Sequence, residues 1–168
     1  MAFTTNFRVA PAFGTNTKIY NFDGQVRTFA GGGNRIDVML LQALFHIFYY
    51  EINANAGVKA PAKTTGPIKV DGIVGPQTRI HIEHFQQFLL KNNLTATADG
   101  VMDPFQKQGI LSPHTKKPFQ LVSLNGLILA TAMKMAFPEV HQDMINFHKG
   151  PIYPDELRAA LRTPRALT

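Results

Sequence analysis

One segment, from Val70 to Thr78, constrains the fold of this chain more than any other feature of its sequence. It reads Val-Asp-Gly-Ile-Val-Gly-Pro-Gln-Thr, so an apolar stretch is interrupted by an Asp-Gly pair. Gly72 can adopt a positive φ without steric cost, and the Asp71 side chain can bond back to the backbone. The segment therefore predicts a tight turn, which we expect Ile73 to anchor in the core.

The end of the same segment predicts the start of a helix. Pro76 follows Gly75, and proline suits the first helical turn because its missing N–H would have no partner inside the helix. The hydroxyl of Thr78 can bond free backbone groups in that turn. Apolar residues then recur at helical spacing as far as Lys91, so we expect a helix over residues 78–91.

A second turn of the same kind lies further along the chain. Asp99-Gly100 opens the run Asp-Gly-Val-Met-Asp-Pro, and an apolar–Gln pair precedes each turn: Leu41-Gln42 the first and Phe85-Gln86 the second. These four landmarks, in this order, resemble the three-helix peptidoglycan-binding domain family, which is found beside cell-wall hydrolases and in some phage proteins. The resemblance covers about residues 35–110 and implies three helices with an internal pseudo-repeat.

The resemblance also implies a ligand site, because the groove of that family lies near these turns. The glycan-binding residues that it implies are Asp71, Gly72, Gly75, Thr78 and His81. This chain departs from the family pattern in a longer connection from Tyr50 to Val70, in His81 where a small residue is usual, and in Asp103 where glycine is usual. These departures predict a groove that is remodelled or closed.

Three other segments predict helices. Residues 37–50 place apolar side chains at helical spacing behind Asp37, which we expect at the N-cap. Residues 119–137 form a long apolar run that ends before a proline, and residues 153–162 begin with Tyr-Pro-Asp-Glu, a typical helix start. Residues 54–69 predict an exposed loop. The expected core of the central unit is Val38, Leu41, Phe45, Phe48, Ile73, Ile82, Phe85 and Leu89.

The first 35 residues differ in character from the rest. Two short alternating pieces flank Asp23-Gly24, which predicts a β-hairpin. Five phenylalanines, at positions 3, 7, 13, 22 and 29, need a surface that covers them, either the chain's own core or a neighbouring subunit. We therefore divide this mainly α chain into a docking arm with a loop and β-hairpin (1–35), a peptidoglycan-binding-like domain (36–112) and a C-terminal helical extension (113–168).

Composition excludes several classes of protein. The chain has no cysteine, which removes disulfides and thiolate metal sites. Its net charge of +6 is spread along the chain without a basic cluster, so we expect no nucleic-acid partner. No apolar stretch is long enough to predict a membrane span. The first residues, Met-Ala-Phe-Thr-Thr-Asn, lack the features of a signal peptide, so we expect synthesis in the cytoplasm without a leader.

Catalytic and metal-binding patterns are weak. His81, Glu83 and His84 have the wrong spacing for a zinc-peptidase pair. His141, Asp143 and His148 form a looser set, and the sequence near them provides no additional ligand for a metal ion. The only serines, Ser112 and Ser123, are not part of a nucleophile elbow. We expect no metal, no cofactor and no enzymatic activity.

Three functions remain open on this basis. The first is a structural, non-catalytic component of a phage particle or a contractile injection-type assembly, held by other subunits through its N-terminal arm and C-terminal helices. The second is a stand-alone peptidoglycan-binding module, and the third is a lysis accessory protein or small enzyme. The Phe-rich arm and the C-terminal extension favour the first, because docking into an assembly needs such surfaces. Particle association would also account for the missing leader.

Overall fold

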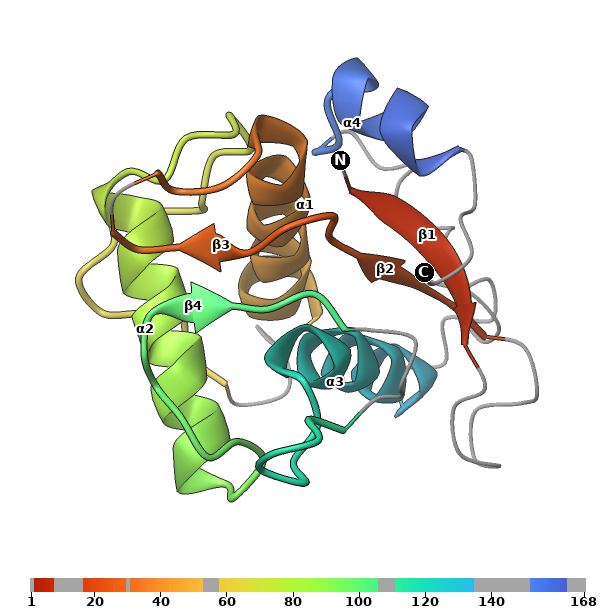
Figure 1. Cartoon of the computed structure of the whole chain (residues 1–168). Coiled ribbons are helices and arrows are strands. Elements are labelled where there is room, and N and C mark those ends of the chain that lie inside the picture. The colour runs from red at the N-terminus through yellow and green to blue at the C-terminus, as the bar shows by residue number, and fades with distance from the viewer. Residues whose placement is uncertain are drawn as a thin grey trace.

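The computed structural model is mainly α-helical (Figure 1) and describes residues 2–7, 17–29, 31–52, 58–105, 111–134 and 152–162. Its helices are α1 (Arg35–His46), continued by the π-helical segment η2 (Ile47–Ile52), then α2 (Pro76–Lys91), α3 (Gln120–Lys134) and α4 (Asp155–Leu161). Its strands are β1 (Phe3–Phe7), β2 (Thr17–Asn21), β3 (Val26–Arg27) and β4 (Val101–Met102).

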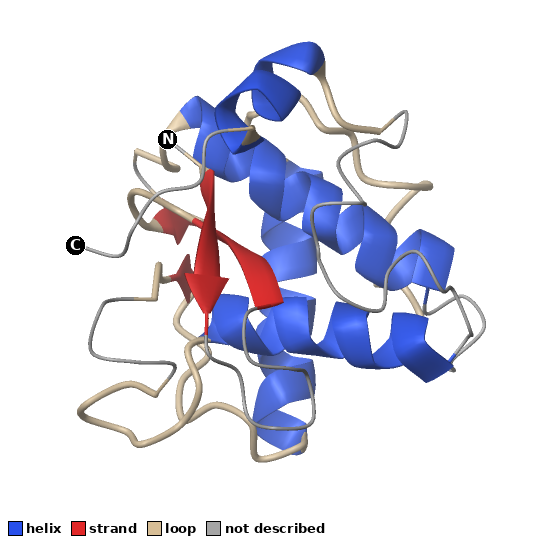
Figure 2. Ribbon diagram, turned by 90° about the vertical axis from the view of Figure 1, so that its right-hand side faces the viewer, coloured by secondary structure: helices blue, strands red, loops and turns tan. Residues whose placement is uncertain are grey.

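Aromatic rings join the helices at the centre of the molecule. Phe45 of α1 and Phe48 of η2 both contact Phe85 of α2, with ring centroids 5.7 and 5.5 Å apart in edge-to-face orientations that favour aromatic pairs. Helix α3 packs against η2 and β2, and α4 packs against α1 and β1. The β1–β2 sheet lies on one side of the helices (Figure 2).

The predicted helices are present, with one correction at a cap. Helix α2 begins with Pro76, as the Gly-Pro pair predicts, and α4 follows Pro154. The N-cap of α1 is Asn34, whose side chain accepts the N–H of Ile36 at 2.9 Å, so the prediction of Asp37 at this position is wrong. The end of the run predicted over 119–137 lies outside the described residues.

The predicted hairpin around Asp23-Gly24 is also wrong, although its two strands exist. Strand β2 pairs antiparallel with β1, with Phe3 opposite Asn21, whereas β3 pairs with β4, with Val26 opposite Met102. The physical reason is Asp37, whose side chain is fully buried in α1. Its two carboxylate oxygens accept the N–H groups of Asp23 (3.4 Å) and Gly24 (3.2 Å), so the turn is bound to the helix. Burial raises the pKa of this carboxyl.

Part of the predicted docking arm contributes to the core of the chain. Ile19, Tyr20, Phe22 and Val26 are all buried. For Phe22 the covering surface is therefore the chain's own core, whereas Phe29 is 51% exposed. Phe13 lies outside the described residues, and the boundaries of the three predicted parts stay a prediction.

Two asparagines attach strand β2 to distant parts of the chain. The side chain of Asn21 bonds both the N–H (3.1 Å) and the carbonyl oxygen (2.9 Å) of Phe105. The side chain of Asn125 in α3 bonds the N–H (3.0 Å) and the carbonyl oxygen (3.1 Å) of Tyr20 in the same way. Both asparagines are buried, so these bonds are shielded from water.

The expected core is confirmed except at one position. Ile73 is 63% exposed, so its predicted role as the anchor of the first turn is wrong. A polar side chain, described below, anchors the turn in its place. The other predicted core residues are all buried: Val38, Leu41, Phe45, Phe48, Ile82, Phe85 and Leu89.

Candidate functional site

The first Asp-Gly turn is held by one buried glutamine. Gln42 of α1 accepts the N–H groups of Asp71 (3.0 Å) and Gly72 (2.8 Å) with its side-chain oxygen. Its amide nitrogen lies 3.0 Å or less from the carboxylate of Asp71, the carbonyl oxygen of Ile73 and the hydroxyl of Thr78. We call this arrangement the Gln42 clamp. It joins α1, the turn and the first turn of α2.

The second Asp-Gly turn has the same kind of clamp. Gln86 of α2 accepts the N–H of Gly100 at 2.8 Å, and its amide nitrogen lies 3.0 Å from the carbonyl oxygen of Val101. The same nitrogen lies 2.8 Å from the side-chain oxygen of Gln120, at the start of α3. In each turn the aspartate carboxylate also accepts the N–H two residues later, at 2.9 and 3.0 Å. The pseudo-repeat of the sequence is thus a repeat of hydrogen bonding as well.

Both turns use a left-handed glycine, as the sequence predicts. Gly72 and Gly100 each have φ of +76°. A Cβ on Gly72 would lie 2.7 Å from Cγ and 2.9 Å from the carbonyl oxygen of Arg35, so backbone as well as side chain stands in its way.

We expect Gly72→Ala to lower the free energy of unfolding by at least about 1 kcal/mol, because the new side chain meets both strain and a backbone clash. Gly126→Ala in α3 is the control, since a Cβ there meets nothing within 4 Å. In a helix interior that change should stabilise by up to about 1 kcal/mol. Urea unfolding measures both, and two variants of equal stability would contradict the strained turn.

The residues implied as glycan contacts differ in accessibility. Asp71 is exposed, and Gly72 and Gly75 are half-buried. Thr78 and His81 are buried, with their polar atoms engaged in bonds inside the protein. A ligand at this turn can therefore reach the first three residues, whereas the last two support the turn and helix α2 from within.

His81 belongs to a polar cluster that the sequence did not indicate. Its Nδ1 lies 2.8 Å from the carbonyl oxygen of Gln77, so this nitrogen carries a hydrogen and donates it. Its Nε2 lies 3.0 Å from the hydroxyl of Tyr50, which is also 3.1 Å from the carbonyl oxygen of Gly66. In the neutral imidazole, Nε2 accepts the Tyr50 proton. Burial lowers the pKa of His81, and burial also lowers that of His84 one turn later.

We expect the free energy of unfolding to fall as pH drops below about 6.5, the ordinary pKa of an unfolded histidine. Between that value and the lower folded pKa, the unfolded chain binds more protons than the folded one, so acid favours unfolding. Each of the two histidines adds a slope of up to about 1.4 kcal/mol per pH unit. Urea titrations at several pH values measure it, and His81→Leu should flatten the curve. A wild-type curve without slope would contradict the buried neutral imidazole.

His84 has a different partner and a different exposure. Its Nδ1 lies 2.9 Å from the hydroxyl of Tyr49 in η2, which is buried. Burial strongly raises the pKa of Tyr49, so the phenol keeps its proton. The imidazole itself is half-buried.

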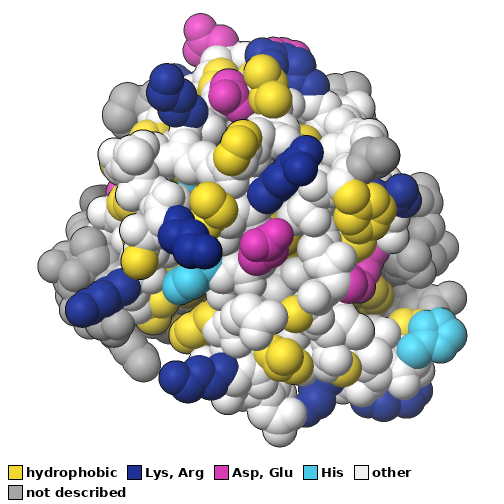
Figure 3. Space-filling view, turned by 90° about the vertical axis from the view of Figure 1, so that its left-hand side faces the viewer, with side chains coloured by type: hydrophobic (Ala, Val, Ile, Leu, Met, Phe, Trp, Pro, Cys, Tyr) yellow, Lys and Arg dark blue, Asp and Glu magenta, His cyan; other side chains and the backbone are white. Residues whose placement is uncertain are grey.

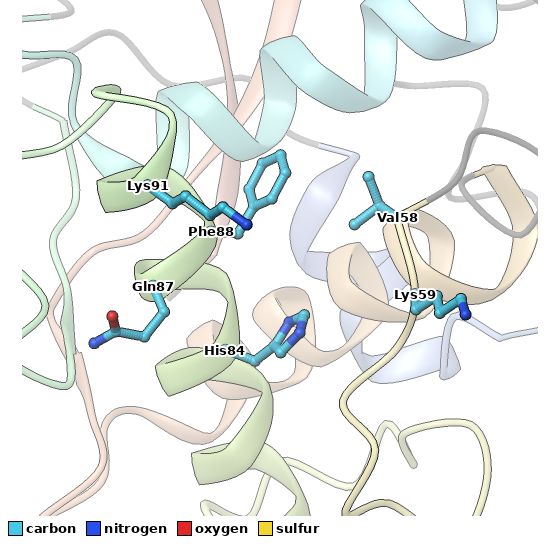
Figure 4. A pocket seen from close by; sticks show the side chains of 6 residues that line it. All are labelled: Val58, Lys59, His84, Gln87, Phe88 and Lys91. Carbon is cyan, nitrogen blue, oxygen red and sulfur yellow. The ribbon is translucent and has the colours of Figure 1, made fainter.

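A groove of about 380 Å³ opens beside His84. The segment at Val58 and Lys59 forms one side, and α2 forms the other (Figure 4). Figure 3 shows the side of the molecule on which α2 lies in Figure 1, where Lys and Arg side chains are spread between apolar patches. The lining residues are Val58, Lys59, His84, Gln87, Phe88 and Lys91.

Other candidate chemistry finds no support in the part of the chain that the structure describes. No group of three or more His, Asp or Glu side chains there is placed to hold a metal ion. His141, Asp143 and His148 lie outside the described residues. Ser112 lies in a loop, where its hydroxyl accepts the N–H of Thr115. No helix in the described ranges is both long and apolar enough to span a bilayer.

No family model, curated protein or solved structure matches this chain.

Proposed function

We propose that the protein is a non-catalytic binding component that carries a peptidoglycan-binding-like unit and contacts cell-wall glycan through the surface at its first Asp-Gly turn. The single observation that carries this proposal is the repeated clamp. Gln42 and Gln86 come from the two apolar–Gln landmarks of the resemblance and hold the two Asp-Gly turns in the same way. The shared hydrogen bonding supports the resemblance independently of the matching residue types.

The surface that we propose for glycan consists of Phe29, Asp71, Ile73 and Val74, and we call it the turn surface. Phe29 and Ile73 are exposed, and their segments meet where Gly32 approaches the side chain of Val74. Apolar side chains at a turn can pack on the C–H faces of a sugar, and the exposed Asp71 carboxylate can accept hydroxyl groups. Exposed apolar patches often mark such binding surfaces.

A second candidate function is the structural role in a phage particle or contractile injection-type assembly. The same exposed Phe29 and Ile73 favour it, because an interface between subunits also needs apolar contact area. In this candidate the partners are other subunits, which dock on the folded surface and on the C-terminal helices. Residues 17–27 could not act as a free arm, since their apolar side chains are occupied in the core.

Co-sedimentation with isolated sacculi tests the first candidate. We expect the wild type to pellet with sacculi without clearing them, and the double variant Phe29→Ser, Ile73→Ser to stay in solution. The matched control is Leu90→Ser, Leu111→Ser, which removes two exposed apolar side chains elsewhere. Equal pelleting of all three proteins would exclude the turn surface. A wild-type protein that does not pellet with sacculi but self-associates in light scattering would favour the role in an assembly.

A further inference from the structure

We propose that the groove beside His84 binds a carboxylate that is attached to a small apolar group. The groove lies along the C-terminal half of α2, whereas the turn surface lies at the N-terminal end of that helix. The inference therefore goes beyond the proposed function and does not depend on it. It rests on three features: a fixed hydrogen-bond donor, two exposed cations and an apolar wall.

The donor is Nε2 of His84, and Tyr49 fixes it. In the described part of the chain the buried hydroxyl of Tyr49 has one hydrogen-bond partner, Nδ1 of His84 at 2.9 Å. If Nδ1 carried the imidazole hydrogen, the phenol proton would be buried without an acceptor, which costs about 1–3 kcal/mol. The phenol therefore donates to Nδ1, and the neutral ring carries its hydrogen on Nε2. Among the described residues Nε2 makes no hydrogen bond, so this donor is open to a ligand.

The two cations are Lys59 and Lys91. Both are exposed, and neither makes a hydrogen bond or ion pair within the ranges that the structure describes. No aspartate or glutamate lines the groove in the described part of the chain. Apart from the amide of Gln87, the polar side chains of the groove are donors. In Figure 4 the Gln87 amide points away from Val58, and the Lys59 side chain extends away from His84. Such a set of donors complements an anion and has little to offer a cation.

The apolar wall selects among anions. Phe88 is half-buried and its ring is supported by Phe48 and Phe85, with centroids 6.1 and 6.3 Å away. Val58 provides apolar contact on the other side of the groove. A site that combines a few convergent polar groups with apolar walls is typical of small-ligand binding. A ligand that fills it has a carboxylate near the donors and an apolar substituent on Phe88 and Val58.

The test uses ¹⁵N-labelled full-length protein and N-acetyl-alanine, which has a carboxylate next to a methyl group. We expect saturable shifts of the backbone amides of Lys59, His84, Phe88 and Lys91. N-acetyl-alanine amide has the same shape without the charge, and it should bind at least about tenfold more weakly. Inorganic phosphate, which lacks the apolar part, should also be weaker. Equal binding of the amide, equal binding of phosphate, or no saturable shift would each overturn the proposal.

Variants locate the site. Lys91→Met should weaken N-acetyl-alanine by about fivefold or more, whereas Lys63→Met, an exposed lysine outside the groove, should have no effect. The imidazole ¹⁵N spectrum of the free protein should show the hydrogen of His84 on Nε2, and Tyr49→Phe should mix the two tautomers. A wild-type ring with its hydrogen on Nδ1 would overturn the role of Tyr49 as the positioning residue.

Discussion

Replacing Gln42 by leucine is expected to lower the free energy of unfolding by about 3 kcal/mol, because it removes a buried side chain that satisfies polar groups of the first Asp-Gly turn and of α2. The N–H groups of Asp71 and Gly72 lose their acceptor, and the hydroxyl of Thr78 loses a partner. Leucine fills a volume similar to that of glutamine, so the loss of stability reflects missing hydrogen bonds more than altered packing. Urea unfolding followed by circular dichroism measures the change.

Two matched variants interpret that result. Gln86→Leu removes the equivalent clamp at the second turn, where Gly100 loses its acceptor, and should cost a similar amount. Gln87→Leu, one residue later on α2, changes an exposed side chain that makes no hydrogen bond to the described residues, and it should stay within about 0.5 kcal/mol. If Gln42→Leu were as mild as Gln87→Leu, each turn would be held by its own aspartate alone.

The helices and the turns could be predicted because they depend on neighbours in sequence. The four-residue spacing of Phe85 and Leu89 predicts the buried face of α2. The pair Asp71-Gly72 is enough to predict its turn, because both residue types favour that backbone conformation. The sequence also located Gln42 and Gln86 beside apolar residues. It did not show that these side chains, rather than Ile73, anchor the turns, because a glutamine in a helix is usually on the surface.

The rest of the fold depends on contacts between distant residues. The composition of β2 is typical of a strand, but its pairing partner depends on distant residues. Asn125 of α3 bonds the backbone of β2, and Asp37 bonds the turn at Gly24 that follows β2. The candidate groove was missed for the same reason. Lys59 lies in a segment that reads as a plain loop, and only the fold brings it to His84. The sole signal in the sequence was a pair of histidines, His81 and His84, one turn apart.

Removal of residues 1–30 is expected to abolish cooperative folding. Among the described residues it takes five buried apolar side chains from the core, four of them large: Ala2, Ile19, Tyr20, Phe22 and Val26. Losing each large buried side chain costs roughly 2–5 kcal/mol, and a domain has only about 5–15 kcal/mol in total. Strand β4 also loses its partner β3, and Asn125 loses the backbone of Tyr20. A flat thermal melt by circular dichroism is the expected result.

Two point substitutions separate a core role of this segment from a docking role without such a large deletion. Phe22→Ala should cost about 3–5 kcal/mol and leave the oligomeric state unchanged, because Phe22 is 1% exposed. Phe29→Ala should change stability by less than about 0.5 kcal/mol, because half of that side chain already faces water. If size exclusion with light scattering showed instead that Phe22→Ala stays stable but loses self-association, the segment would be a docking element whose phenylalanines are covered by a second subunit. The burial of Phe22 beneath its own chain argues for the first result, whereas Phe29 and Ile73 stay exposed, so the proposed contact with a glycan or a partner subunit rests on them and not on Phe22.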